Sequence, residues 1–169
     1  MVPIANPDTM PELIKIAATI AQQQGGILIL LRVVTVPEQI PLSLQSNLIE
    51  REKPILDLGQ KEAEKYGVEA NALLKVSYNT SRAILETARE RSCSLIVLGW
   101  KGYSSNRDKI LGQVVDTVVT YARCDIMLIK RVPGPIFDNV LLPTAGGEHA
   151  RTAEAYAAML VKAAEGKLT

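Results

Sequence analysis

Two glycine-bearing stretches decide the fold of this chain: SLIVLGWKG at residues 94–102 and GQVV at residues 112–115. The run Ser94–Leu98 is apolar apart from its first residue, which is typical of a strand covered on both faces. Glycines follow that strand, and Gly112 opens a helix with an apolar inner face. That face is expected to comprise Val115, Val118, Val119 and Ala122. A buried strand that passes through a glycine-bearing loop into a helix indicates a parallel α/β sheet.

Short apolar runs and helical patterns alternate along most of the chain. Strands are expected at Val2–Ala5, Ile27–Val34, Val68–Val76, Ser94–Leu98 and Asp125–Lys130, and helices at 9–24, 42–66, 81–91 and 112–122. Thr9 with Glu12 has the spacing of a capping box at the start of the first helix. Pro54 predicts a break or kink in the second helix, because proline removes a backbone donor. The part after Pro54 is expected to turn Ile55, Leu58, Ala63 and Tyr66 inward.

The order of elements predicts an α/β fold with a doubly wound parallel sheet and helices on both faces, because crossovers between parallel strands are right-handed. The most apolar runs, Ile27–Val34 and Ser94–Leu98, are expected in the interior of the sheet. Val68–Val76 alternates apolar and polar residues, which is typical of a strand partly open to water. We therefore expect five strands in the order 3-2-1-4-5, with Val68–Val76 and Asp125–Lys130 at the edges.

The end of the chain is similar to its beginning when the two are aligned without a gap. Pro143 then corresponds to Pro3, and Gly166 corresponds to Gly26. An internal repeat explains this, and a chance match of two Ala-rich amphipathic helices is the alternative. We predict a domain at 1–131, a linker at 132–138 and an incomplete second repeat at 139–169. That repeat would supply the first strand and helix of a second copy.

Composition excludes several functional classes. Lys and Arg number 19 against 18 Asp and Glu, so nothing favours nucleic acid as a partner. The longest apolar run, Ile27–Leu31, is too short to insert in a bilayer, and we expect a cytoplasmic location. Cys93 and Cys124 are expected as small buried side chains in a reducing compartment. A single histidine, His149, leaves no basis for a metal site or for Ser-His-Asp catalysis, so no enzyme is expected.

The glycine spacing at 99–112, Gly-x2-Gly-x9-Gly, resembles the phosphate loop of the universal stress protein family. Val2-Pro3, Arg32–Val34, Ala83-Ile84 and Ala122–Ile126 agree with the family at the corresponding elements, and the resemblance covers residues 1–131. It implies a pocket for ATP or AMP at the carboxyl ends of the first and fourth strands. Ile4, Ala5 and Val33 would form its base side, and Gly99, Gly102, Gly112, Gln113 and Val114 its phosphate side. Lys101, Arg107 and Lys109 would add positive charge, and Asp108 would offset part of it.

Two residues depart from the family pattern. Gln113 stands where a serine or threonine hydroxyl usually meets a phosphate, and Ala5 stands where an aspartate is usual. These departures predict a degenerate or weak pocket. The segments VPIANP at 2–7 and GWKG at 99–102 resemble the tandem stress-protein domains appended to amino-acid permeases and cation/proton antiporters.

Three functions remain open on these grounds. The first is a regulatory or sensor domain of a membrane transporter, with the transmembrane part of the same polypeptide as a partner. The second is a free-standing nucleotide-binding stress protein, and the third is a dimerisation module without a ligand. A homodimer through the edge strand Asp125–Lys130 is expected, as is docking of the apolar stripe in 153–164 on a neighbouring chain or on the chain's own sheet.

Overall fold

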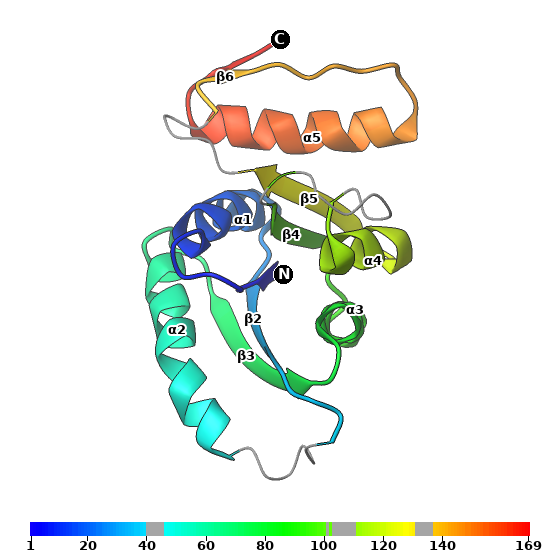
Figure 1. Ribbon diagram of the computed structural model, residues 1–169. Helices are drawn as coiled ribbons and strands as arrows, with labels where there is room; N and C mark the ends of the chain where they lie inside the picture. The colour runs from blue at the N-terminus through cyan, green and yellow to red at the C-terminus, as the bar shows by residue number, and fades with distance from the viewer. Residues whose placement is uncertain (40–45, 101, 103–110, 131–136) are drawn as a thin grey trace.

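The computed structural model describes residues 1–39, 46–100, 102, 111–130 and 137–169 (Figure 1). The strands are β1 Val2–Pro3, β2 Leu28–Thr35, β3 Ala70–Ser77, β4 Leu95–Trp100, β5 Asp125–Lys130, β6 Asn139–Val140 and β7 Lys167–Leu168. The helices are α1 Met10–Gln24, α2 Ser46–Glu64, α3 Thr80–Glu90, α4 Gln113–Tyr121 and α5 Glu148–Ala163. The expected alternation of strands and helices is therefore present.

The central strands form two parallel pieces. One has the order β1-β2-β3, and the other pairs β4 with β5. Within the described residues, β3 and β5 each pair with a single strand, as an edge position requires. Met1 links the pieces, since its backbone nitrogen donates to the Leu95 carbonyl at 2.7 Å. The Val97 N–H in turn donates to the Met1 carbonyl at 2.9 Å. The parallel α/β architecture is confirmed, with β1 and β4 side by side through these two bonds.

Two helical layers cover the sheet. α1 and α2 lie on one face, and α3 and α4 lie on the other (Figure 1). β2 faces both layers, because Leu28 and Leu30 join the core under α1 while Ile29 and Leu31 join the core under α3. All four of these side chains are buried, which explains the continuous apolar run of this strand. None of the helices in the described part of the chain has the length and apolar character that a membrane span requires.

Several local expectations were wrong, and one of them is the inward position of Val119, which is 45% exposed. Pro54 lies inside α2 without breaking it, since the carbonyl it leaves without a donor belongs to the exposed Glu50 and can be hydrated. Leu58 is 54% exposed, and the neighbouring Leu56 is buried in its place. Thr9 caps α1 without a capping box, because its helical backbone (φ −98°, ψ −14°) does not present the hydroxyl to the first turn. The hydroxyl donates to the Asn6 carbonyl at 3.3 Å instead.

Residues 137–169 form a separate β-α-β element, which we call the C-terminal unit. Its strands β6 and β7 pair in parallel, as β1 and β2 do. Val140 lies opposite Leu168 in the same way that Val2 lies opposite Leu30, and the two partners are equally far apart along the chain in both pairs. The strand pair of the C-terminal unit therefore has the same register as the pair of β1 and β2.

The strand register is compatible with the gapless alignment, because the partners are equally far apart along the chain in both strand pairs and a gapless shift keeps that separation. The helix ends also agree with the gapless alignment. Gly26 N donates to Ala21 O at 2.8 Å, and Gly166 N donates to Val161 O at 2.9 Å.

Gly166 permits a close approach between the end of α5 and the backbone before β6. A Cβ at this position would collide with the Phe137 carbonyl oxygen and lie 2.8 Å from the Asp138 carbonyl oxygen. The chain before β6 can therefore pass close to the end of α5 only because residue 166 lacks a side chain.

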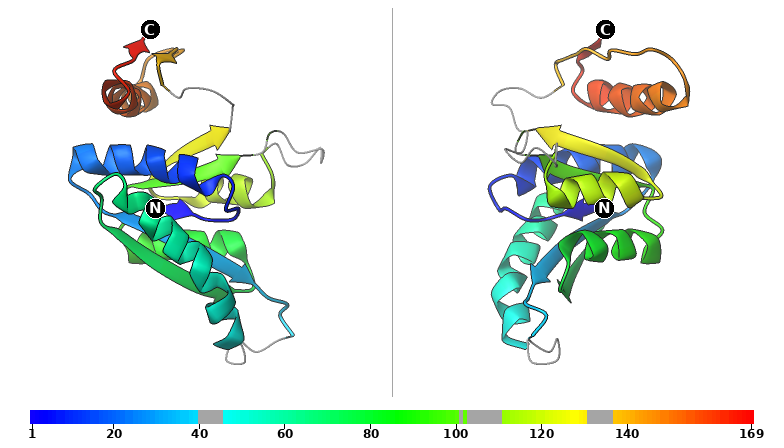
Figure 2. Two further views of the ribbon diagram at one scale, coloured as in Figure 1. Left: turned by 90° about the vertical axis from the view of Figure 1, so that its left-hand side faces the viewer. Right: turned by 45° about the vertical axis from the view of Figure 1, so that its right-hand side comes forward.

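The C-terminal unit lies beside β5 and α1 (Figures 1 and 2). Leu160 and the partly buried Tyr156 pack into the core that α1 shares with Met127 of β5. The Tyr156 hydroxyl donates to Asp125 Oδ2 at 2.9 Å, and Gln23 Nε2 donates to the Met159 carbonyl at 2.7 Å. Of the two dockings expected for the apolar stripe, the structure has the one on the chain's own sheet.

Candidate functional site

A cavity of about 330 Å³ opens where β1, β2 and β4 end. In parallel sheets, ligands bind at the carboxyl ends of the strands, where the winding of the chain reverses. Leu13 of α1, Ile84 of α3 and Val115 of α4 supply the side walls. Because most of the wall is aliphatic, the cavity suits the flat body of an organic ligand better than a bare ion.

Five of the eight predicted site residues line this cavity: Ile4, Ala5, Val33, Gly99 and Val114. They follow or belong to four different elements of the fold, so the tertiary structure brings together residues that are far apart in the sequence. Ile4 is buried, and Ala5 is exposed at the rim. The whole predicted base side is therefore in one place, together with two members of the predicted phosphate side.

The remaining three residues, Gly102, Gly112 and Gln113, do not line the cavity that the described residues define. They flank 103–110, which lies outside the described residues together with Lys101, so the predicted contributions of Lys101, Arg107, Asp108 and Lys109 fall there as well. Gly102 and Gly112 have φ of 111° and 104°, a region that residues with a Cβ adopt only under strain. Gln113 is the exposed first residue of α4.

Asp116 introduces a negative charge at the start of α4. Its Oδ1 accepts a hydrogen bond from the Leu111 N–H at 3.1 Å, and Asp116 belongs to the first turn. The partial positive charge of a helix N-terminus favours anions, so this carboxylate competes with any phosphate placed there.

Gly99 has a packing role as well as a place in the site. A Cβ at this position would lie 3.3 Å from Leu13 Cδ1, closer than most such contacts. The end of β4 can therefore approach α1 only because residue 99 lacks a side chain. This contact accounts for a glycine here whether or not a ligand binds.

Arg32 is the main cavity residue that the sequence did not assign to the site. Its Nη1 donates to the carbonyl oxygens of Ile4 at 3.0 Å and Ala5 at 2.9 Å, and its Nε donates to Glu52 Oε2 at 2.7 Å. The guanidinium thus ties the end of β1 to β2 and α2. A charged residue inside the apolar run of β2 was the available signal, since a partly buried arginine needs acceptors.

Other lining residues add polarity that the sequence did not predict. Glu12 and Thr9 come from the start of α1, and Thr80 comes from the start of α3. Thr80 Oγ1 is 2.7 Å from Thr35 Oγ1, which joins that helix to the end of β2. Trp100 also lines the cavity, and Lys130 Nζ lies 5.8 Å from the centre of its ring. Among the described residues, no three His, Cys, Asp or Glu side chains gather closely enough to hold a metal ion.

The sequence of residues 1–130 matches the model of the universal stress protein family. The chain belongs to the universal stress protein family. A relative is the Na⁺/H⁺ antiporter NhaS5 of Synechocystis sp., which is 28% identical over 145 residues that cover 85% of this chain. The match spans only 21% of the length of that antiporter.

Solved structures of other members share the fold. A universal stress protein from Archaeoglobus fulgidus in complex with dAMP aligns with a TM-score of 0.60 and 21% identity, covering 76% of this chain and 94% of its own. A longer universal stress protein from the same species aligns with a TM-score of 0.67 and 18% identity, covering 99% of this chain and 64% of its own. The second alignment therefore includes most of the C-terminal unit.

Proposed function

We propose that this stress-protein domain binds an adenine nucleotide weakly in the cavity between β1, β2 and β4, and that it regulates a membrane transporter of which it is a part. The main support for a nucleotide ligand is the cavity itself, which is lined by Ile4, Val33 and Gly99 at the carboxyl ends of the strands. The family member solved with dAMP supports this choice of ligand. The similarity to an antiporter supports the transporter.

Weak binding follows from the charges around the cavity. Arg32 already donates to two backbone carbonyls and to Glu52, so its guanidinium is engaged within the protein. Asp116 sits in the first turn of α4, where its carboxylate repels phosphate. Ala5 offers no carboxylate to a ribose or a base. We expect ATP and AMP to bind no tighter than tens of micromolar, about 6 kcal/mol of binding free energy.

Calorimetric titration with ATP and AMP tests the site. Ala5→Trp should abolish binding by filling the cavity from its exposed rim, while Ala155→Trp, on the exposed face of α5, should leave it unchanged. Restoring the family pattern with Gln113→Ser and Ala5→Asp together should strengthen ATP binding. If Ala5→Trp binds ATP and AMP as tightly as the parent chain does, this cavity is not the nucleotide site. A sub-micromolar constant for the parent chain would reject the weak pocket, and no gain in the double variant would favour a module without a ligand.

The transporter assignment can be tested with an antibody raised against the domain. In membrane and soluble fractions of the source cells, we expect a membrane-bound polypeptide several times larger than 18.4 kDa. A soluble species near that mass would favour a free-standing stress protein in the cytoplasm.

We further propose that the two sheet pieces act as one sheet in the order β3-β2-β1-β4-β5, and that the C-terminal unit begins a second copy after a linker at 132–138. Support comes from the Met1 hydrogen bonds and from the equal spacing of the strand partners in the two copies. The unit now lies where a partner strand would approach β5, so the predicted homodimer requires its displacement. Sedimentation at micromolar concentration distinguishes a monomer from a species of twice the mass.

A further inference from the structure

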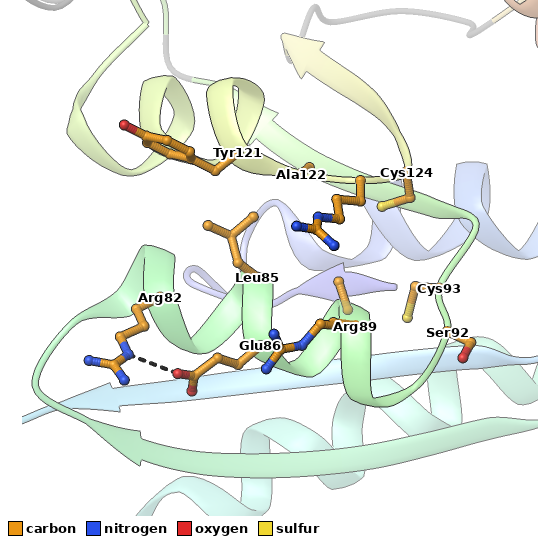
Figure 3. A pocket seen from close by; sticks show the side chains of 11 residues that line it. Arg82, Leu85, Glu86, Arg89, Ser92, Cys93, Tyr121, Ala122 and Cys124 are labelled. Atoms are coloured by element: carbon orange, nitrogen blue, oxygen red, sulfur yellow. Dashed lines mark hydrogen bonds and ion pairs between the residues drawn. The ribbon is translucent and has the colours of Figure 1, made fainter.

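A second cavity, of about 530 Å³, lies between α3 and the C-terminal end of α4 (Figure 3). Its lining shares no residue with the cavity at the carboxyl ends of the strands. α3 contributes Leu85 and Arg89, α4 contributes Tyr121, and the segments that precede β4 and β5 contribute Cys93 and Cys124. The proposed nucleotide site makes no use of these groups.

Positive charge dominates the lining. Arg82 is paired with Glu86 at 2.8 Å between Nε and Oε1, so these two largely cancel. Arg89 and Arg123 also line the cavity, and no carboxylate of the described residues forms an ion pair with either. The C-terminal ends of α3 and α4 contribute about half a negative charge each. Two full guanidinium charges exceed that sum, so the cavity keeps a net attraction for anions.

The rest of the lining is apolar or neutral. Leu85 points from α3 toward α4, and Tyr121 stands at the rim with 68% of its surface exposed (Figure 3). Burial raises the pKa of the Cys124 thiol, with a further contribution from Cys93. The thiol therefore stays neutral at physiological pH and adds no negative charge. The cavity therefore combines aliphatic side chains and an exposed aromatic ring with two guanidinium groups that have no carboxylate partner among the described residues.

We propose that this cavity binds a small organic anion, with a phosphate or carboxylate head between Arg89 and Arg123 and an apolar or aromatic body against Leu85 and Tyr121. Guanidinium groups form charge-assisted, often bidentate hydrogen bonds with both kinds of head group. The apolar part of the ligand would contact Leu85 and Tyr121, which are accessible to water in the free protein. A bare inorganic anion would satisfy only the charge, and a neutral aromatic compound only the apolar part.

The test is a titration of the full chain with phenyl phosphate, benzoate, inorganic phosphate and phenol, followed by backbone amide chemical shifts. Phenyl phosphate or benzoate should bind at least tenfold more tightly than inorganic phosphate or phenol, with shifts concentrated in 85–93 and 121–124. The better of the two identifies the head group. Failure of both to bind, or shifts confined to the cavity between β1 and β4, would overturn the proposal.

Variants separate the charge from the apolar contact. Arg89→Gln with Arg123→Gln should weaken binding of the better probe more than tenfold, because each removes charged hydrogen bonds. Arg151→Gln, on the exposed face of α5, is the matched control and should change nothing. Tyr121→Ala should weaken the aromatic probe and leave inorganic phosphate unaffected. An unchanged affinity in the double arginine variant would overturn the proposal, since all three replaced arginines are exposed and the fold should tolerate their loss.

Discussion

Replacing Leu160 with alanine should loosen the C-terminal unit from the first domain. Leu160 is 6% exposed and packs in the core shared by α1 and β5. The change removes three carbons, which at about 0.8 kcal/mol each is about 2.4 kcal/mol of lost burial. The remaining cavity adds to that cost, but α5 is a peripheral helix that can settle into it, so we expect a total of about 2–3 kcal/mol. Leu141→Ala is the matched control, because Leu141 is 75% exposed.

Native-state hydrogen exchange measures this opening directly. A loss of about 2–3 kcal/mol corresponds to amide exchange in α5 that is faster by about 30- to 160-fold. Leu141→Ala should change it less than threefold. Sedimentation of Leu160→Ala should also show more of the species with twice the monomer mass, since β5 would be uncovered. Equal exchange rates in the two variants would refute the docking of α5 as an energetic contact.

Three further changes test single contacts. Burial and the hydrogen bond to Asp125 raise the pKa of Tyr156 to about 12, so the stability from this phenol is complete below its ordinary pKa of about 10 and lost as pH rises through 12. In Tyr156→Phe, the midpoint of urea unfolding should fall less with rising pH over that range than it does in the parent chain. Gly166→Ala should expose the C-terminal unit to limited proteolysis through collision with the Phe137 carbonyl, whereas Gly25→Ala, where a Cβ meets open space, should cost only about 1 kcal/mol. Arg32→Met should lower the free energy of unfolding by about 1–3 kcal/mol, measured by urea titration, because the carbonyls of Ile4 and Ala5 lose their donor.

Hydrophobic patterning predicted the strands well because it reports directly on burial. β4 is buried through Leu95–Leu98, and β3 has a single strand neighbour in the described residues, as its alternating pattern indicated. The pattern failed in α2, where several apolar residues compete for one face. Leu56 and Leu58 are both plausible by spacing, and only packing against the sheet decides that Leu56 is inside.

The position of Ile4, Ala5 and Val33 around one cavity was predictable, because all three lie near the carboxyl ends of strands. Arg32 was missed because two of its partners are the backbone carbonyls of Ile4 and Ala5, and any residue type can supply a backbone carbonyl. The close approach of Gly166 to the backbone before β6 was missed for a similar reason, because helical periodicity does not report contacts with a distant backbone segment.

The contact between α5 and the β5 side of the sheet does not depend on protein concentration. Both elements belong to one polypeptide and are separated only by residues 131–147, so the helix is present near the strand at an effective concentration on the order of millimolar. A separate chain would have to reach such a level in the cell to cover the same strand equally well. Coverage of β5 therefore does not depend on expression level, and an edge strand that could nucleate aggregation stays shielded in scarce and abundant protein alike.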